Sequence, residues 1–417
     1  MLSFEFATAN KIIFGAGKLK ELGKQIEGAA LSAEGVSKGS AKRLLFVCGR
    51  SSDAIPRVRE ILSASDIPFT ELQVHGEPAI EVVREGIQAA HDCDMVIGLG
   101  GGSVLDAGKA IAALATNPGD VFDYLEVVGK GQPLVNASLP YIAIPTTAGT
   151  GAEVTRNAVL ESAEQNVKVS MRSPLMLPRL ALVDSELTYN LPPEITASSG
   201  LDALTQLIEP FVSVKANPMT DAICREGLSH AARSLRRAYE DSKRTLTRIN
   251  GLETDSQAVS TLEAIKEARE GMALASLFGG LALANAGLGA VHGFAGPLGG
   301  MLHAPHGVLC ARMLPLVMDA NIKALETRQP EHPALGRYVE IARILTGEKD
   351  VTAYDGARWA SELVSALKIP RLSAYGMRPD DFALREAVQK TQKANSFKGN
   401  PIVLDERELT KILEQAL

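Results

Sequence analysis

The segment from Asp94 to Lys109 constrains the fold of this 417-residue chain more than any other part of it. Residues 95–99 form a short apolar run, which is typical of a strand buried on both faces. Three glycines follow at positions 100–102, and Ser103 then opens a helical pattern, with Asp106 three residues later as in a capping box. Because bare backbone N–H groups and the dipole at a helix N-terminus attract negative charge, the segment predicts a phosphate site.

A tight strand-to-helix turn without a ligand is the alternative interpretation of the same residues. The spacing from Gly98 to Ser103 fits a G-x-G-x-x-small pattern, which counts against a simple turn. Three consecutive glycines also carry an entropic cost that a simple turn does not require.

Length and composition indicate a globular protein of two domains. A chain of 417 residues is too long for one ordinary core, and 46% hydrophobic with 22% charged residues is typical of soluble proteins. A net charge of −6 without a basic stripe argues against a nucleic-acid partner. The four cysteines contain no C-x-x-C pair, which favours a reducing cytoplasm and argues against a zinc–thiolate site. The first residues lack the pattern of a secretory signal.

Residues 271–302 contain no Asp, Glu, Lys or Arg and are long enough to cross a bilayer. However, the segment holds nine glycines together with Asn285, His292 and Pro297, and its flanks show neither a positive-inside pattern nor an aromatic belt. We therefore expect a buried helix that ends near residues 285–287, followed by a glycine-rich loop, and no membrane association.

The first half of the chain alternates short apolar runs with helical patterns. This alternation predicts parallel β-α-β units with helices on both faces of a sheet, and any cofactor then lies at the carboxyl ends of the strands. The expected strands are 43–48, 69–74, 95–99, 141–144 and 180–183, and the expected helices between them are 54–63 and 80–90.

After Asn190 the strand patterns stop, so we divide the chain into an α/β domain, residues 1–190, and an all-helical domain, residues 191–417. Leu191-Pro-Pro-Glu194 is typical of the first turn of a helix. Residues 241–260 are polar and indicate a surface excursion between helices. Helices are expected at 198–208, 219–239, 261–285, 306–321, 338–345 and 354–367.

The second half also contains candidate metal ligands. Asp202 and Gln206 stand four residues apart, so on a helix they share one face. Three of the seven histidines, His292, His303 and His306, fall within 15 residues of mostly apolar sequence, where an unpartnered imidazole is costly. Imidazoles with a carboxylate suit Zn²⁺ or Fe²⁺. The spacing alone does not decide between such a site and an ordinary N-terminal helix charge at Asp202.

Hydroxyl groups follow the strand expected at 141–144. Thr146, Thr147 and Thr150 are placed to bind sugar or phosphate, although a hydroxyl-rich turn in which a threonine caps a helix explains them equally well. Lys168 is one of few basic residues in its stretch, and such a lysine is more often solvated than bound to a ligand.

The end of the first expected strand bears on the choice of nucleotide. In dinucleotide folds an acid at this point binds the ribose 2′-hydroxyl, whereas a basic residue accommodates a 2′-phosphate. Here Gly49 stands in place of an acid and is followed by Arg50, Ser51 and Ser52, which favours NADP over NAD. A plain helix cap by Ser51 or Ser52 is the alternative.

Taken together, these motifs resemble the iron-containing (group III) alcohol dehydrogenase family. The resemblance runs from about residue 11 to the C-terminus and keeps the family's order. The matching strings are Phe14-Gly-Ala-Gly17, Gly100-Gly-Gly-Ser-Val-Leu-Asp-Ala-Gly-Lys109, Pro145-Thr-Thr-Ala-Gly-Thr-Gly-Ala-Glu153, Asp202-Ala-Leu-Thr-Gln206 and Pro305-His-Gly307.

The resemblance implies a Rossmann-like dinucleotide domain, an all-α domain as in the dehydroquinate synthase-like fold, and a metal in the cleft between them. Asp202, His292 and His306 match three of the family's four metal ligands, and Gln206 stands where the family has the fourth, a histidine. By position, the diphosphate contacts would be Gly101, Gly102 and Ser103, and the cofactor cleft would be lined by Asp106, Thr146, Thr147, Thr150 and Lys168.

A second difference concerns proton transfer. The family usually has a histidine four residues after His292, where this chain has Gly296. The proton would come from water or from the ribose hydroxyl, with His303 as a relay in place of that histidine. His292 and His303 are the candidate catalytic residues.

The sequence therefore predicts a cytoplasmic, metal-dependent alcohol dehydrogenase or aldehyde/ketone reductase that uses NADP (or NAD) with Fe²⁺ or Zn²⁺. Its substrate would be a small alcohol or carbonyl compound, and the protein would form a homodimer. Two alternatives remain: a metal-independent reductase of the maleylacetate type, and a catalytically silent NADP-binding protein.

Overall fold

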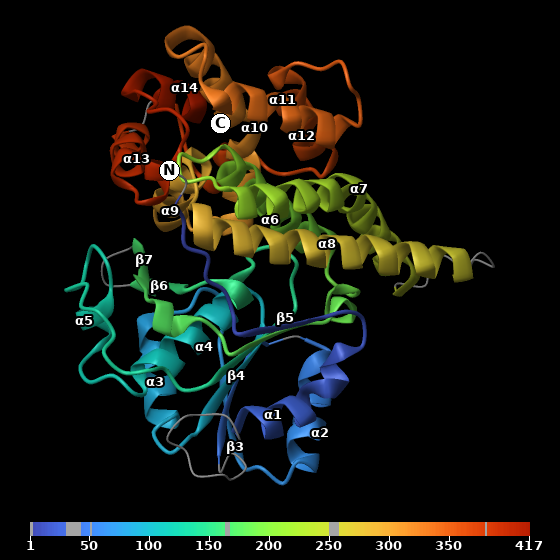
Figure 1. Ribbon diagram of the computed structural model, residues 1–417, viewed down its shortest axis with the longest axis vertical. Coiled ribbons are helices and arrows are strands. Elements are labelled where there is room, and N and C mark those ends of the chain that lie inside the picture. The colour runs from blue at the N-terminus through green and yellow to red at the C-terminus, as the bar shows by residue number, and fades with distance from the viewer. Residues whose placement is uncertain (1–2, 31–42, 51, 163–166, 250–257, 380–381) are drawn as a thin grey trace. The chain divides into compact units, whose positions relative to one another are not determined.

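The computed structural model describes residues 3–30, 43–50, 52–162, 167–249, 258–379 and 382–417 (Figure 1). The chain forms two compact units. The first, here called the α/β unit, comprises Ala7–Thr147 and Gly151–Tyr189, and the second, the helical unit, comprises Met1–Phe6, Ala148–Thr150 and Asn190–Leu417. The assignment of cofactor binding to residues 1–190 and of metal binding to 191–417 stays a prediction.

The α/β unit is built on a six-stranded sheet in which every paired strand is parallel, as the alternating sequence pattern predicted. The strand order is β1-β8-β5-β4-β2-β3. All five expected strands are present, and the edge strand β1 was missed. The strands are β1 (Lys11–Phe14), β2 (Leu44–Cys48), β3 (Phe69–Gln73), β4 (Met95–Gly100), β5 (Tyr141–Pro145) and β8 (Leu180–Val183).

Strands β2 and β4 are neighbours at the point where the strand order reverses. Strand β3 lies on the outer side of β2, whereas β5 and β8 follow on the other side of β4. In open α/β sheets, ligands bind at the carboxyl ends of the strands at such a switch point. The ends of β2 and β4 pair directly, since Cys48 lies opposite Leu99.

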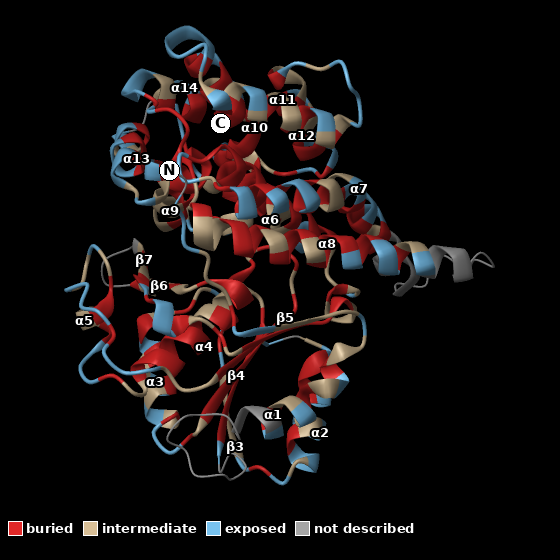
Figure 2. Ribbon diagram, viewed as in Figure 1, coloured by how far each residue is buried: buried red, intermediate tan, exposed pale blue. Residues whose placement is uncertain are grey.

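Helices cover both faces of this sheet because buried side chains alternate along its strands. Leu45 and Val47 pack into a core with α3 and α4, whereas Leu44 and Phe46 pack with α1 and α2 on the opposite face (Figure 2). An antiparallel hairpin of β6 (Asn157–Ser162) and β7 (Val167–Arg172) completes the unit. The helices are α1 (Leu22–Ala30), α2 (Ala54–Ala64), α3 (Ile80–Ala89), α4 (Gly102–Leu114) and α5 (Val121–Tyr124).

The helical unit packs around one continuous apolar core, with α6 buried along most of its length. A helix that is buried on all sides places its polar residues inside the core, where each needs a partner. The described helices are α6 (Pro193–Val212), α7 (Pro218–Ile249), α8 (Ala258–Ala286), α9 (Ala290–Leu302), α10 (His306–Arg328), α11 (Pro333–Thr346), α12 (Ala353–Ala366), α13 (Phe382–Lys393) and α14 (Glu406–Ala416).

Two sequence predictions for this unit were wrong. The expected surface excursion at 241–260 is largely helical, since α7 continues to Ile249 and α8 begins at Ala258; residues 250–257 lie outside the described part of the chain. Helix α8 does end near the expected point, but the expected glycine-rich loop is helix α9. The glycines of α9 allow close packing: a Cβ on Gly293 would lie 3.3 Å from Cβ of Phe397.

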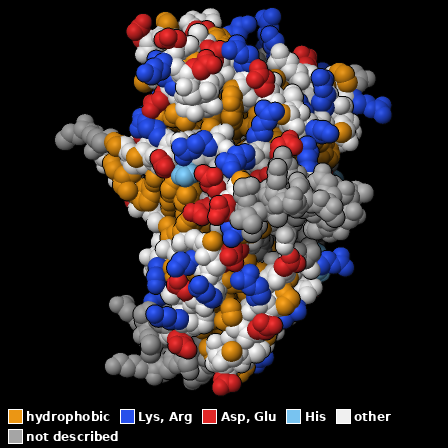
Figure 3. Space-filling view, turned by 90° about the vertical axis from the view of Figure 1, so that its right-hand side faces the viewer, with side chains coloured by type: hydrophobic (Ala, Val, Ile, Leu, Met, Phe, Trp, Pro, Cys, Tyr) orange, Lys and Arg blue, Asp and Glu red, His pale blue; other side chains and the backbone are white. Residues whose placement is uncertain are grey.

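No helix among the described residues is by itself both long and apolar enough to cross a membrane; Glu263–Ala286 and Ala290–Leu302 pass that test only as a pair bent by 100°. On the face drawn in Figure 3, acidic and basic side chains are interspersed rather than gathered by sign. The absence of membrane and nucleic-acid partners stays a prediction.

Candidate metal centre and cofactor turn

The glycine-rich turn joins the carboxyl end of β4 to the start of α4. Strand β4 ends at Gly100, and Gly101 is the N-cap of α4 in extended conformation, without a side-chain cap. A Cβ on Gly100 would lie 2.5 Å from Cγ2 of Val104, so only glycine lets the helix begin directly over the strand. The first N–H groups of α4, at Gly102 and Ser103, have no partner within the helix and are oriented for an anion.

The prediction that Ser103 and Asp106 form a capping box is wrong, since the N-cap of α4 is Gly101. Asp106 turns instead toward Lys109, whose Nζ lies 2.9 Å from Asp106 Oδ1, and its other oxygen accepts a hydrogen bond of 2.9 Å from Val159 N–H. Lys109 is only 1% exposed and also donates to Thr155 Oγ1 at 2.8 Å and to the carbonyl of Asn157. Burial of the ammonium requires a counterion nearby, which explains why Asp106 does not cap the helix.

The predicted nucleotide-selecting residues follow β2, beside this turn. Gly49 N–H donates to the carbonyl of Leu99 at 3.3 Å, and Arg50 is exposed. Ser51 lies outside the described residues. Ser52 Oγ accepts a hydrogen bond of 3.2 Å from Ala54 N–H, but the N-cap of α2 is Asp53 and no side chain caps the helix, so the capping alternative is wrong.

Two of the three predicted threonines lie beside the same turn. Thr146 is buried and its N–H donates to the carbonyl of Gly100 at 2.9 Å. Thr147 is partly exposed, and a Cβ on Gly101 would lie 3.4 Å from its methyl group. Thr150 belongs to the helical unit.

Lys168 is not solvated, contrary to the alternative considered from the sequence. Its side chain is only 9% exposed, and Nζ lies 2.6 Å from Oε1 of Glu77. Its role in cofactor binding, like that of Asp106, stays a prediction.

Glu153, in the same motif as the threonines, gives a pH-dependent stability. Burial raises its pKa from 4.5 to about 7, against the opposing effects of its own backbone N–H and of Lys109. Because the folded state holds the proton more tightly than the unfolded state, stability from this group is lost as pH rises from 4.5 through 7.

We therefore expect Glu153→Gln to stabilise the protein by about 3 kcal/mol at pH 8 and to have little effect at pH 4.5. Urea unfolding of both proteins at the two pH values, followed by circular dichroism, measures this difference. A difference between wild type and variant that does not change with pH would contradict the expectation.

Four potential metal ligands from three helices of the helical unit converge on one point. Asp202 comes from α6, His292 from α9, and His306 and Cys310 from α10, and one ligand atom of each lies within 4.8 Å of those of the others. Asp202 Oδ1 lies 3.4 Å from Nε2 of His292 and 3.8 Å from Nε2 of His306. The predicted convergence of Asp202, His292 and His306 is present in the structure.

Surrounding side chains orient these groups. Glu209 Oε2 lies 2.6 Å from Nδ1 of His292, and its Oε1 accepts a hydrogen bond of 2.7 Å from Val291 N–H. Since a carboxylate can only accept here, Nδ1 carries the proton and Nε2 faces the cluster, as in carboxylate–histidine–metal arrangements. Gln206 Nε2 donates to Asp202 Oδ2 at 3.1 Å.

The cluster fits a divalent cation. Asp202 is 1% exposed, and its Oδ1 has no hydrogen-bond partner although it faces both imidazoles. Burial lowers the pKa of His306, but the electrostatic effects of Cys310 and Asp202 outweigh it and raise that pKa to about 9. The pKa of His292 is raised for similar reasons, with Glu209 contributing. The cluster therefore favours positive charge at its centre. A bound divalent cation would supply that charge in place of the imidazole protons.

The predicted proton carrier, His303, does not belong to the cluster. His303 is the exposed C-cap of α9 in left-handed conformation, φ 50°, and it is not part of the four-residue cluster. Gly296 is one turn beyond His292 on α9, and a Cβ there would meet no atom within 4 Å. Cys310 was missed because it does not belong to a C-x-x-C pair, although its spacing of four residues from His306 on a helix indicates a shared face.

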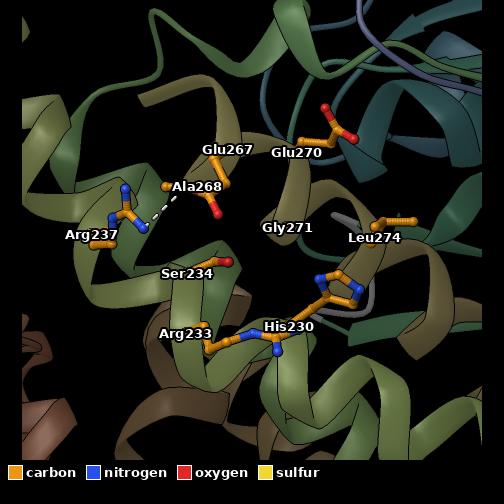
Figure 4. A pocket seen from close by; sticks show the side chains of 9 residues that line it. All are labelled: His230, Arg233, Ser234, Arg237, Glu267, Ala268, Glu270, Gly271 and Leu274. Carbon is orange, nitrogen blue, oxygen red and sulfur yellow. Dashed lines mark hydrogen bonds and ion pairs between the residues drawn. The ribbon is translucent and has the colours of Figure 1, made fainter. Parts of the chain in front are cut away.

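A separate groove of about 390 Å³ is lined by residues of α7 and α8 and by none of the predicted site residues (Figure 4). Arg237 forms an ion pair of 3.3 Å with Glu267 across it, and His230 and Glu270 also line it. Among the described residues, its lining includes no group of three or more His, Cys, Asp or Glu side chains close enough to hold a metal ion.

Comparisons with known proteins cover both units. Residues 9–185 match the model of the iron-containing alcohol dehydrogenase family, and residues 196–264 and 252–417 match that of its C-terminal region. The chain is 31% identical to choline dehydrogenase of Bacillus subtilis, over 97% of this chain and 92% of the relative. It is 33% identical to alcohol dehydrogenase 4 of Schizosaccharomyces pombe, over 97% of this chain and 87% of the relative. The crystal structure of a 1,3-propanediol oxidoreductase superposes with a TM-score of 0.83 at 30% identity, over 100% of both chains. The chain therefore belongs to the iron-containing alcohol dehydrogenase family.

Proposed function

We propose that this protein is a metal-dependent, NADP-preferring oxidoreductase that interconverts a small alcohol and its carbonyl compound. The family supplies the reaction type: alcohol oxidoreduction with a nicotinamide cofactor and a divalent metal. The observation that carries the assignment to this chain is the buried, unpartnered Oδ1 of Asp202 between the Nε2 atoms of His292 and His306.

When bound, the divalent cation would supply a Lewis acid for the substrate oxygen, and the nicotinamide would carry the hydride. The chain's own residues position both groups. Glu209 fixes the ring of His292 so that Nε2 points at the cation site, and Gln206 holds one oxygen of Asp202 so that the other is free. The N–H groups at the start of α4 bind the diphosphate. His303, exposed at the end of α9, is the proposed proton carrier.

The substrate we propose is a small primary alcohol or the corresponding aldehyde. Choline and 1,3-propanediol, named for two of the relatives, share a primary hydroxyl group on a short chain. A cytoplasmic location and a homodimeric state are further proposals, and sedimentation equilibrium tests the second.

The function is tested with protein purified without added metal. We expect elemental analysis to find a divalent metal in wild type, and NADPH oxidation with at least one member of a panel of short aldehydes. We expect His292→Ala to lose both its bound metal and its NADPH oxidation, which would connect the metal to the activity. Metal-free protein with undiminished turnover would favour the maleylacetate-type reductase, and NADPH binding without turnover on the whole panel would favour a silent binding protein.

The preference for NADP depends on the residues that follow β2. We expect Arg50→Ala to raise the dissociation constant for NADPH by roughly 10- to 100-fold and to leave that for NADH nearly unchanged, because a charge-assisted contact to the 2′-phosphate is lost.

Gly49→Asp is the matched gain-of-function variant. Its Cβ would lie 3.5 Å from Val104 Cγ2, an ordinary contact, and we expect its carboxylate to repel the 2′-phosphate and to favour NADH. Fluorescence titrations with both nucleotides measure these effects, and equal effects of either substitution on NADPH and NADH would overturn the preference.

A further inference from the structure

We propose that Cys310 supplies a fourth protein ligand to the divalent cation, as a thiolate, beside Asp202, His292 and His306. This inference rests on the proposed function, since it assigns a ligand to the same cation. It also reverses the expectation that this chain lacks a zinc–thiolate site.

The distances at the cluster are those of ligands that share one ion. Sγ of Cys310 lies 3.7 Å from Nε2 of His292 and 3.5 Å from Nε2 of His306. Bonds of about 2.0–2.1 Å to nitrogen and about 2.3 Å to sulfur, in a tetrahedral arrangement, place neighbouring ligand atoms roughly 3.3–3.6 Å apart. The contacts of Asp202 Oδ1, at 3.4 and 3.8 Å, fall close to the same range.

Gln206 does not occupy the place of a fourth ligand. Its Nε2 donates to Asp202 Oδ2, and its Oε1 lies on the side of α8, 3.4 Å from the position of a Cβ on Gly279. Gln206 therefore binds the oxygen of Asp202 that does not face the imidazoles. Cys310, on α10, contacts both imidazoles directly.

The ligand set also balances the charge of the ion. Cys310 is fully buried on α10, one turn after His306, so no solvent competes for its sulfur. One thiolate and one carboxylate together neutralise a divalent cation in a buried site. A sulfur ligand favours Zn²⁺ and Co²⁺ over harder ions of the same charge.

Substitution of Co²⁺ into the whole protein tests the proposal without relying on turnover. We expect a thiolate-to-Co²⁺ charge-transfer band in the near ultraviolet together with visible ligand-field bands. In Cys310→Ser the near-ultraviolet band should disappear while the visible bands remain. Cys224→Ser is the matched control, because Cys224 is equally buried in the same unit but outside the cluster, and it should keep both bands.

The outcomes separate this proposal from the proposed function. Visible bands without a charge-transfer band in wild type overturn the role of Cys310 and leave the metal centre intact. Failure to bind Co²⁺ at all overturns both. If Cys310→Ser does not fold, X-ray absorption of Zn²⁺-loaded wild type decides: one sulfur at about 2.3 Å supports the proposal, and a shell of nitrogen and oxygen only refutes it.

Discussion

Asp202→Asn should lower kcat/KM by on the order of 10³-fold and remove most of the bound metal. The substitution keeps the shape of the side chain and allows the contact with Gln206 to persist, but it removes the negative charge that faces both imidazoles. The loss should therefore arise from the cation site and leave the helix packing intact. Parallel measurements of metal content, steady-state kinetics and circular dichroism distinguish these effects.

Thr205→Ser is a suitable control for this prediction. Thr205 is buried on the same helix and its hydroxyl donates to the carbonyl of Leu201, away from the cluster. This variant should keep its metal and its activity. A folded Asp202→Asn protein with wild-type metal content and turnover would contradict the assignment of Asp202 as a ligand.

Lys109→Met is expected to destabilise the folded protein by about 3–5 kcal/mol, because it leaves the carboxylate of Asp106 without its cation in a largely buried position. The ammonium at 109 also satisfies Thr155 Oγ1 and the carbonyl of Asn157, and those acceptors lose their donor as well. The free energy of unfolding in urea, measured without nucleotide, reports the effect.

The contrasting variant is Lys18→Met. Lys18 and Glu21 form an ion pair of 2.7 Å with the same three-residue separation, but both side chains are partly exposed. Exposed pairs contribute roughly 0–1 kcal/mol, so this change should cost little. Combining Lys109→Met with Asp106→Asn should recover part of the lost stability. Equal costs for the two lysine substitutions would show that the buried network does not anchor α4 to the hairpin.

The parallel sheet was predictable because strands that are buried on both faces have continuous apolar sequences. Strands β2 and β4 are fully buried and were located to within one residue. Strand β1 is as short as β8, but it begins with an exposed lysine at the sheet edge and is only partly buried, so its apolar run is weaker. Helix α9 was missed because glycine and proline usually break helices, whereas here Gly293 permits close packing against Phe397 and Pro297 lies within the helix.

The candidate metal centre was only partly predictable. Asp202 and the histidines stand out because they are rare residue types in apolar sequence. The pairing of Lys168 with Glu77 joins residues 91 positions apart and depends on the tertiary fold alone. The spacing of Cys310 from His306 indicates a shared helix face, but its place beside the other potential ligands follows only from the packing of three helices.

The central claim, a catalytic cation held by Asp202, His292 and His306, is tested most directly by metal titration of chelator-stripped protein. Bound metal and NADPH-dependent turnover should be followed in the same samples. The account predicts that stripped protein is inactive and that turnover rises in proportion to bound metal up to one ion per chain. Full turnover in protein that holds far less than one ion per chain would contradict it.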